Sequence, residues 1–143
     1  MGKRSTGRKL AMQALYQADV SASPLKDVFD DIFARESYLK ETVDFAKGLA
    51  YGAWEKKAVS DKIISRLSKN WSIERIGRVV VSILRLALYE LNEEKDTPAS
   101  VVINEAVMLS KTFATDEAAK FVNGVLGGYL KENEACSPGS QKK

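Results

Sequence analysis

Four basic side chains gather within the first nine residues, a segment that contains no acidic residue. The other 18 of the chain's 22 lysines and arginines face 19 acidic residues, so the net charge of +3 originates in this segment. A mobile arm of such cations can neutralise phosphates by charge alone, without fixed geometry. The segment therefore favours a nucleic-acid ligand, although basic ends also serve simply as solubilising tails. Its cations are Lys3, Arg4, Arg8 and Lys9.

Two phenylalanines and a lysine late in the chain form a second group with binding chemistry. Phe113 is expected at the end of one helix, and Phe121 lies early in the next helix beside Lys120. Unpaired bases stack on aromatic rings for roughly 1–3 kcal/mol each, and a nearby ammonium group can neutralise a phosphate. Core packing is ordinarily the preferred explanation of aromatic residues at helical spacing. The residues alone therefore favour core packing and leave RNA stacking as the alternative.

Several kinds of chemistry lack the residues that they need. The chain contains no histidine, which removes the commonest general base and a common metal ligand. Its single cysteine, Cys136, cannot form an internal disulfide, which fits a reducing compartment. No apolar stretch approaches the length of a membrane span, and no signal-peptide pattern is present. We expect a cytoplasmic protein away from membranes, with no catalytic residue, metal or cofactor.

The length and the apolar pattern indicate one helical domain. A chain of 143 residues that is 45% hydrophobic has the size of a single domain with its own core. Apolar residues recur at spacings of three and four without sustained alternation, which is typical of helices. We expect an all-α fold of two packed three-helix bundles, with six to seven helices. The domain is expected to span 1–131, with subdomains at about 5–70 and 72–131, and 132–143 to form a flexible tail.

Capping residues mark where the expected helices begin. Ser23 and Thr97, each followed by a proline, are predicted to cap helices, and Thr115 is predicted to cap the last one. The first helix is expected to begin after Ser5 or Thr6. The expected helical ranges are 6–20, 24–34, 38–68, 76–91, 98–114 and 115–131.

Two pairs of residues inside these helices are predicted to be structural. Gly48 and Gly52 lie four residues apart on one face, where they allow another helix to approach closely or allow a bend. Close packing is the preferred explanation. The helix 76–91 is the most apolar and is expected at the centre. Arg85 and Glu90 interrupt it, and each must reach solvent or be paired, because an isolated buried charge is expensive.

Four strings in the right order identify a resemblance to a known family. They are ALYQAD at 14–19, LRLALYEL at 84–91, INEAVMLSKTF at 103–113 and KFVNGVL at 120–126. Together they resemble the NusB family of bacterial transcription antitermination factors over nearly the whole chain. The resemblance implies a non-catalytic, all-helical protein that binds the single-stranded boxA RNA of ribosomal RNA operon leaders. It also implies pairing with the ribosomal protein NusE, within an RNA polymerase antitermination complex that includes NusA and NusG.

The resemblance assigns functions to individual positions. Tyr16 matches a position that faces NusE, and on its spacing alone the ring could equally pack in the core. Glu117 matches an acidic position that influences RNA affinity, and it also suits the first turn of a helix. The matched RNA-binding residues are Arg4, Arg8, Lys9, Phe113, Glu117, Lys120 and Phe121, with Lys3 as an additional cation.

The chain departs from the family pattern at two places. Ser5, Thr6 and Gly7 dilute what is a tighter arginine run in the family. Val80 and Val81 replace an acidic and a basic residue in the region that helps to hold NusE. With Leu84, they predict either a more apolar partner interface or self-association into a homodimer, and the sequence leaves both open.

Other functions fit parts of the sequence. A protein scaffold without RNA binding would use the apolar face from Val79 to Leu84, and the basic segment would be incidental. The related domain that precedes ribosomal RNA cytosine methyltransferases is disfavoured, because no glycine-rich cofactor loop follows here. A small helical enzyme would need polar groups that converge on a pocket, and the sequence indicates none.

Overall fold

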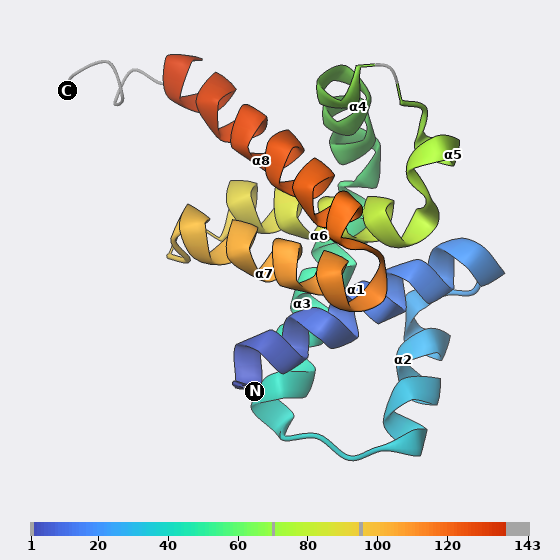
Figure 1. The fold of residues 1–143 in the computed structure, drawn as a ribbon. Helices are drawn as coiled ribbons and strands as arrows, with labels where there is room; N and C mark the ends of the chain where they lie inside the picture. The colour runs from blue at the N-terminus through green and yellow to red at the C-terminus, as the bar shows by residue number, and fades with distance from the viewer. Residues whose placement is uncertain (1, 70, 95, 137–143) are drawn as a thin grey trace.

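The computed structural model describes residues 2–69, 71–94 and 96–136, and every regular element within these ranges is a helix (Figure 1). The prediction of an all-α fold is confirmed. This part of the chain forms eight helices, more than expected, because the range 38–68 is divided and a short helix precedes the central one. Their bounds are α1 Lys3–Ser21, α2 Leu25–Arg35, α3 Lys40–Glu55, α4 Lys57–Ser68, α5 Ile73–Ile76, α6 Arg78–Glu93, α7 Ala99–Phe113 and α8 Asp116–Cys136.

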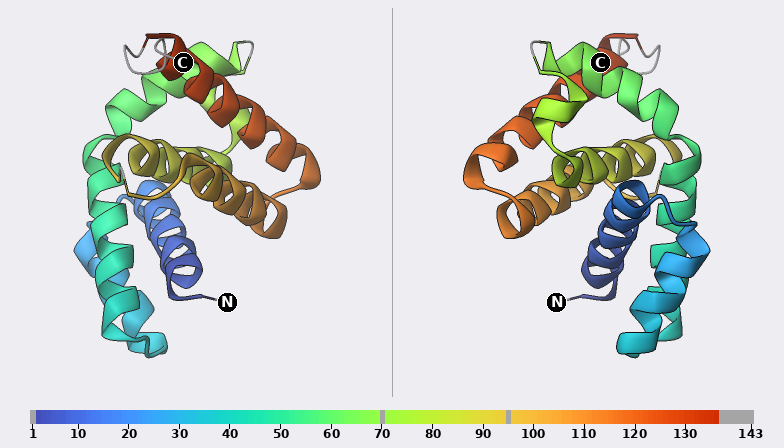
Figure 2. Two further views of the ribbon diagram at one scale, coloured as in Figure 1. Left: turned by 90° about the vertical axis from the view of Figure 1, so that its left-hand side faces the viewer. Right: turned by 90° about the vertical axis from the view of Figure 1, so that its right-hand side faces the viewer.

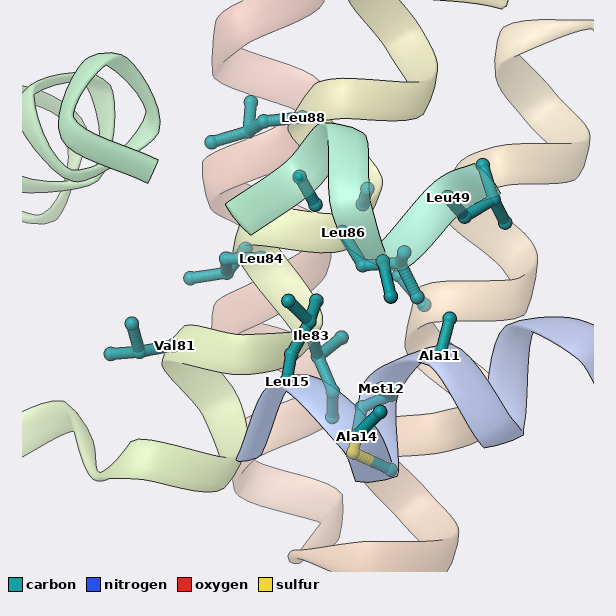
Figure 3. Packing of buried hydrophobic residues seen from close by; sticks show 14 of the residues in the cluster. Ala11, Met12, Ala14, Leu15, Leu49, Val81, Ile83, Leu84, Leu86 and Leu88 are labelled. Carbon is teal, nitrogen blue, oxygen red and sulfur yellow. The ribbon is translucent and has the colours of Figure 1, made fainter. Parts of the chain in front are cut away.

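Helix α6 lies at the centre of the molecule, as its apolar composition predicts. Helices α1, α3, α4, α7 and α8 all pack against it, and every residue from Val80 to Leu88 is buried. Figure 3 shows side chains of α6 gathered with those of α1, including Leu15, and with Leu49 of α3. Burial of one such side chain contributes roughly 1.5–3 kcal/mol. This core fixes the positions of the helices on both sides of α6.

Two groups of helices share α6. Helix α1 packs along α3 and contacts α2, whereas α8 packs along α7 and contacts α4. In both views of Figure 2, α4 and α8 lie above α6, and α1 and α2 lie below it. The start of α1 and the turn between α7 and α8 nevertheless point toward the same side, on the right in the left-hand view and on the left in the right-hand view.

The expected helix 38–68 is interrupted at Lys56. Its backbone, at φ −95° and ψ 11°, leaves the helical conformation, so α3 and α4 are separate. The close-packing explanation holds for Gly52, where an added Cβ would collide with the ring of Tyr89 on α6. It does not hold for Gly48, because an added Cβ there would meet no atom of the described part of the chain within 4 Å. Gly77, between α5 and α6, has a φ of +95°, a conformation that favours glycine.

The predicted caps are partly correct. Thr115 caps α8 as expected, since its hydroxyl accepts a hydrogen bond of 2.9 Å from the backbone N–H of Ala118. Ser23 and Thr97 do not cap, because the prolines that follow them occupy the cap positions themselves. At the other end of α8 the helix continues to Cys136, so the predicted tail begins as helix. The remainder of that tail, 137–143, lies outside the described residues.

Candidate nucleic-acid interface

The basic segment is the first part of a helix rather than a mobile arm. Helix α1 begins at Lys3, and the backbone N–H of Thr6 donates a 3.0 Å hydrogen bond to the carbonyl of Gly2. Gly7 is buried against the ring of Phe45 on α3, at a position where an added Cβ would lie 2.5 Å from Cδ2. The expectation of flexible cations is therefore wrong, because this packing fixes the backbone that carries them.

Arg8 is buried in an ion pair and does not face solvent. Its side chain is 4% exposed, and its Nε and Nη2 donate hydrogen bonds of 2.9 and 2.5 Å to the two carboxylate oxygens of Glu90 on α6. Glu105 on α7 lies 3.7 Å from Nη1. Arg8 thus cannot meet an RNA phosphate in this conformation, which corrects its assignment as an RNA-binding residue. The prediction that Glu90 must reach solvent or be paired is confirmed, since Arg8 pairs with it.

Arg4 and Lys9 remain accessible to an anion. Arg4 is exposed, with its guanidinium 4.7 Å from the centroid of the Phe45 ring. Lys9 is partly exposed. Within the described ranges neither has a carboxylate within 4 Å, whereas Lys3 pairs with Glu41 at 3.1 Å. The two accessible cations therefore carry charge that an RNA phosphate could neutralise.

The two late phenylalanines are both partly accessible, but they do not share a pocket. Phe113 is 36% exposed and ends α7, and Phe121 is partly buried in α8. Phe113 lines a groove with Tyr16, whereas Phe121 lines a separate hollow with Trp71. Lys120 lines a third hollow, of about 820 Å³, between α7 and α8. The expected single corner is thus three separate sites, each with its own lining residues.

The Tyr16–Phe113 groove is a hollow of about 550 Å³ between α1, α2, α6 and α7. Tyr16 and Phe113 are each 36% exposed. The groove combines their aromatic rings with polar groups that could bond to a nucleotide or a peptide. It thus joins the position expected to face NusE to one expected to face RNA. The other lining residues include Gln13, Gln17, Arg35, Glu36, Tyr38 and Val79.

The Trp71–Phe121 hollow, of about 340 Å³, lies on the other side of the α7–α8 turn. Trp71 is 46% exposed, and its ring centroid lies 6.0 Å from that of Phe121. The guanidinium carbon of Arg75 lies 5.3 Å from the centroid of the Trp71 ring. Glu117 and Val80 also line this hollow. Glu117 thus lies beside Phe121, as expected of neighbours on one helix.

The three valines 79–81 point in three directions, because each helical residue is rotated by about 100° from the last. Val79 is partly exposed and lines the Tyr16–Phe113 groove. Val80 is buried and only borders the Trp71–Phe121 hollow. Leu84 has 0% of its surface exposed and belongs to the core. The assignment of Leu84 to a partner surface is therefore wrong, and Val80 offers a partner little area.

The comparison with known proteins decides the family. Residues 5–131 match the NusB family. The chain belongs to the NusB family. The transcription antitermination protein NusB of Bacillus velezensis is 42% identical over 133 residues, which cover 93% of this chain and 99% of that protein. Its counterpart in Bacillus subtilis is 39% identical over 132 residues, covering 92% and 98%.

Solved NusB structures share the fold. A crystal structure of antitermination factors NusB and NusE in complex with double-stranded RNA has a TM-score of 0.84 at 31% identity, covering 92% of this chain and 98% of that chain. The solution structure of NusB from Aquifex aeolicus has a TM-score of 0.82 at 32% identity, covering 96% and 93%. The family predicted from the four strings is confirmed.

Two residues that the NusB-like strings do not include contribute to the candidate interface. Phe45 contacts Gly7 and lies within cation–π distance of Arg4, and Trp71 forms one wall of a hollow. An indication for Trp71 was present in the sequence, since a tryptophan at a helix break has little chance of full burial. Nothing in the sequence near Phe45 indicated its role, because its partners come from another helix.

Within residues 2–69, 71–94 and 96–136, no group of three or more acidic, cysteine or histidine residues could hold a metal ion. None of the helices in the same ranges is both long and apolar enough to cross a membrane.

Proposed function

We propose that this chain is a non-catalytic transcription antitermination factor of the cytoplasm that binds single-stranded boxA-type RNA together with NusE. It acts within an RNA polymerase elongation complex that includes NusA and NusG. Family membership supports the general activity, since its relatives are named as transcription antitermination proteins. The structurally similar complex of NusB and NusE with double-stranded RNA supports NusE and RNA as partners in general.

The observation that carries the proposal is a stripe of accessible side chains along α1 that leads from cations to aromatic rings. Lys9, Gln13 and Tyr16 follow one another at spacings of four and three, so they lie on one face of α1. The distance from Lys9 to Tyr16 along the axis is roughly 10 Å at about 1.5 Å per residue. Tyr16 then adjoins Phe113 in the groove. A strand on this stripe would meet positive charge first and rings second.

Each part of the stripe has a defined chemical task. Arg4 and Lys9 neutralise backbone phosphates and release counterions. The exposed rings of Phe113 and Tyr16 offer stacking surfaces for bases, worth roughly 1–3 kcal/mol per base. Lys120 and Phe121 lie beyond the α7–α8 turn, where a longer strand would continue. NusE docks beside the groove, in contact with Tyr16.

The alternative of a scaffold without RNA binding receives less support. It relies on an apolar face from Val79 to Leu84, and Leu84 has no exposed surface. A homodimer through Val80 would likewise have little apolar area to bury. The accessible cations of α1 have no role in either arrangement.

A binding titration tests the proposal. Fluorescent boxA-type RNA is titrated with the protein at several salt concentrations, with and without NusE. We expect cooperative binding that weakens with salt, and Arg4→Gln/Lys9→Gln should lower the log–log salt slope by about 1.4, since each single-strand contact contributes about 0.7. Lys62→Gln/Lys131→Gln is the matched control, because both lysines are exposed, belong to α4 and α8 rather than α1, and change the net charge equally. Absent or salt-insensitive association would refute the proposed function.

A further inference from the structure

We infer that Arg8 is a positioning residue, which holds the start of α1 in the conformation that presents Arg4 and Lys9 to RNA. This inference rests on the proposed function, because it concerns the same accessible cations. It assigns Arg8 and Glu90 one common task, which is to hold the start of α1 in place. The contacts around Arg8 support it in three steps.

The ion pair between Arg8 and Glu90 anchors the start of α1. Arg8 binds Glu90 through two nitrogens, and the pair is almost fully buried, at 4% and 1% exposure. Such a forked contact fixes the orientation of the guanidinium as well as its position. Glu105 adds a third helix to the site at 3.7 Å. The second turn of α1 is thereby tied to α6 and α7 at once.

The ring of Phe45 connects this ion pair to Arg4. The ring of Phe45 lies 5.4 Å from the guanidinium carbon of Arg8 and 4.7 Å from that of Arg4. The same ring packs on Gly7, where any side chain would intrude. Arg8 on the buried side and Arg4 on the exposed side thus share one aromatic neighbour. A displacement of Arg8 would release the contacts that hold Arg4.

The ion pair of Arg8 also affects Lys9, which follows Arg8 in the chain. Because Arg8 fixes the helix rotation at this turn, Lys9 is held on the face that continues through Gln13 to Tyr16. A cation on an ordered backbone binds without the entropic cost of ordering that backbone. Loss of the anchor should therefore weaken RNA binding although Arg8 itself touches no RNA.

The opposite role makes an opposite prediction. If Arg8 contacted phosphate directly after leaving its pocket, Glu90 would compete with RNA for it. Neutralising Glu90 would then free Arg8, and RNA binding would tighten with a steeper salt slope. If Arg8 positions other cations, neutralising Glu90 should weaken binding even though the protein becomes more positive. The sign of the effect separates the two roles.

Glu90→Gln and Asp61→Asn form a matched pair for this test. Asp61 receives two hydrogen bonds, of 2.8 and 2.7 Å, from Arg85 of α6, so each variant removes one carboxylate from a forked arginine pair and raises the net charge by one. We expect Glu90→Gln to weaken binding of boxA-type RNA about tenfold through lost preorganisation. Asp61→Asn should stay within about twofold of the parent, because it does not hold the start of α1. Equal losses in both variants would indicate general destabilisation and overturn the inference.

Two further measurements keep the result decisive. In the Arg4→Gln/Lys9→Gln background, Glu90→Gln should change affinity by less than about twofold, since the positioned cations are already absent. Hydrogen exchange of the amides at 6–9 should accelerate in Glu90→Gln and not in Asp61→Asn, whether or not RNA is bound. If exchange at 6–9 is faster in Glu90→Gln but the parent protein binds no RNA, the proposed function is refuted and the role of Arg8 in holding α1 is not. Unchanged exchange, or tighter binding by Glu90→Gln, would overturn the inference alone.

Discussion

Two buried arginines join α6 to its neighbours, and they do so in opposite directions. At one site α6 supplies the acid, Glu90, and Arg8 comes from the start of α1. At the other site α6 supplies Arg85, and Asp61 comes from α4. In each case a further acid from another helix lies 3.7 Å away, Glu105 in the first site and Asp19 in the second. The same ionic device thus occurs on two sides of one helix.

The two sites differ in what lies beyond them. Arg8 is within one turn of Arg4 and Lys9, which are accessible to an anion. Arg85 lies among helices α1, α4 and α6, and its Nη1 is buried with no hydrogen-bond partner among the described residues. The hydrogen bonds that Arg85 donates to Asp61 raise the pKa of Arg85, so that arginine stays charged throughout the ordinary pH range. A buried arginine is therefore no evidence of function by itself, since function depends on the surface that it holds in place.

The two sites should differ most in the free energy of unfolding that is lost when the arginine of each is replaced. Arg8→Met would leave Glu90, which is 1% exposed, as a buried charge, at a cost of about 3–5 kcal/mol. Arg85→Met would leave Asp61, which is 26% exposed and can be hydrated, so we expect about 1–2 kcal/mol. Urea unfolding of both variants measures the two free energies. A loss for Arg85→Met that equals or exceeds the loss for Arg8→Met would contradict the distinction.

The sequence could predict that the charges of α6 needed partners, but it could not predict the partners. Burial of Arg85 and Glu90 in an apolar helix requires compensation, and this expectation was correct. The cation that pairs with Glu90 lies 82 residues away in sequence. Composition treats that cation, Arg8, like its exposed neighbours, and the family resemblance assigned it to RNA. Its ion pair forms only when α1 packs on α6.

Features that depend on local sequence were predicted, whereas features that depend on distant segments were missed. Apolar spacing gave the long helices, and the hydroxyl of Thr115 gave a correct cap, because both depend on local sequence. The break at Lys56 carries no proline or glycine of its own. Helix α3 packs on α1 and helix α4 packs on α8, while both pack on α6. Phe113 and Phe121 were placed correctly at the α7–α8 turn. Their separation into two sites depends on Tyr16 and Trp71, which come from distant segments.

Removal of both partners at once should give an intermediate effect. Arg8→Met/Glu90→Leu replaces the buried pair with apolar groups, so it should be less destabilising than Arg8→Met alone by about 2–3 kcal/mol. The matched double variant Arg85→Met/Asp61→Leu should recover less, about 1 kcal/mol or below, because Asp61 is partly hydrated in either state. Double-mutant cycles in urea give both coupling energies. A larger coupling at Arg85 than at Arg8 would reverse the comparison.

The smallest effect is expected at the surface pair beside the Arg8 site. Lys3 and Glu41 also join α1 to α3, at 3.1 Å, but their side chains are 56% and 77% exposed. Lys3→Gln should therefore change the free energy of unfolding by less than about 0.5 kcal/mol, and high salt should abolish the difference. Thermal unfolding at low and high salt measures it, with Lys40→Gln as the control for an exposed pair within one helix. If Lys3→Gln destabilised the protein as much as Arg8→Met, the exposed pair would hold the start of α1 as strongly as the buried pair, and burial would not set the difference between them.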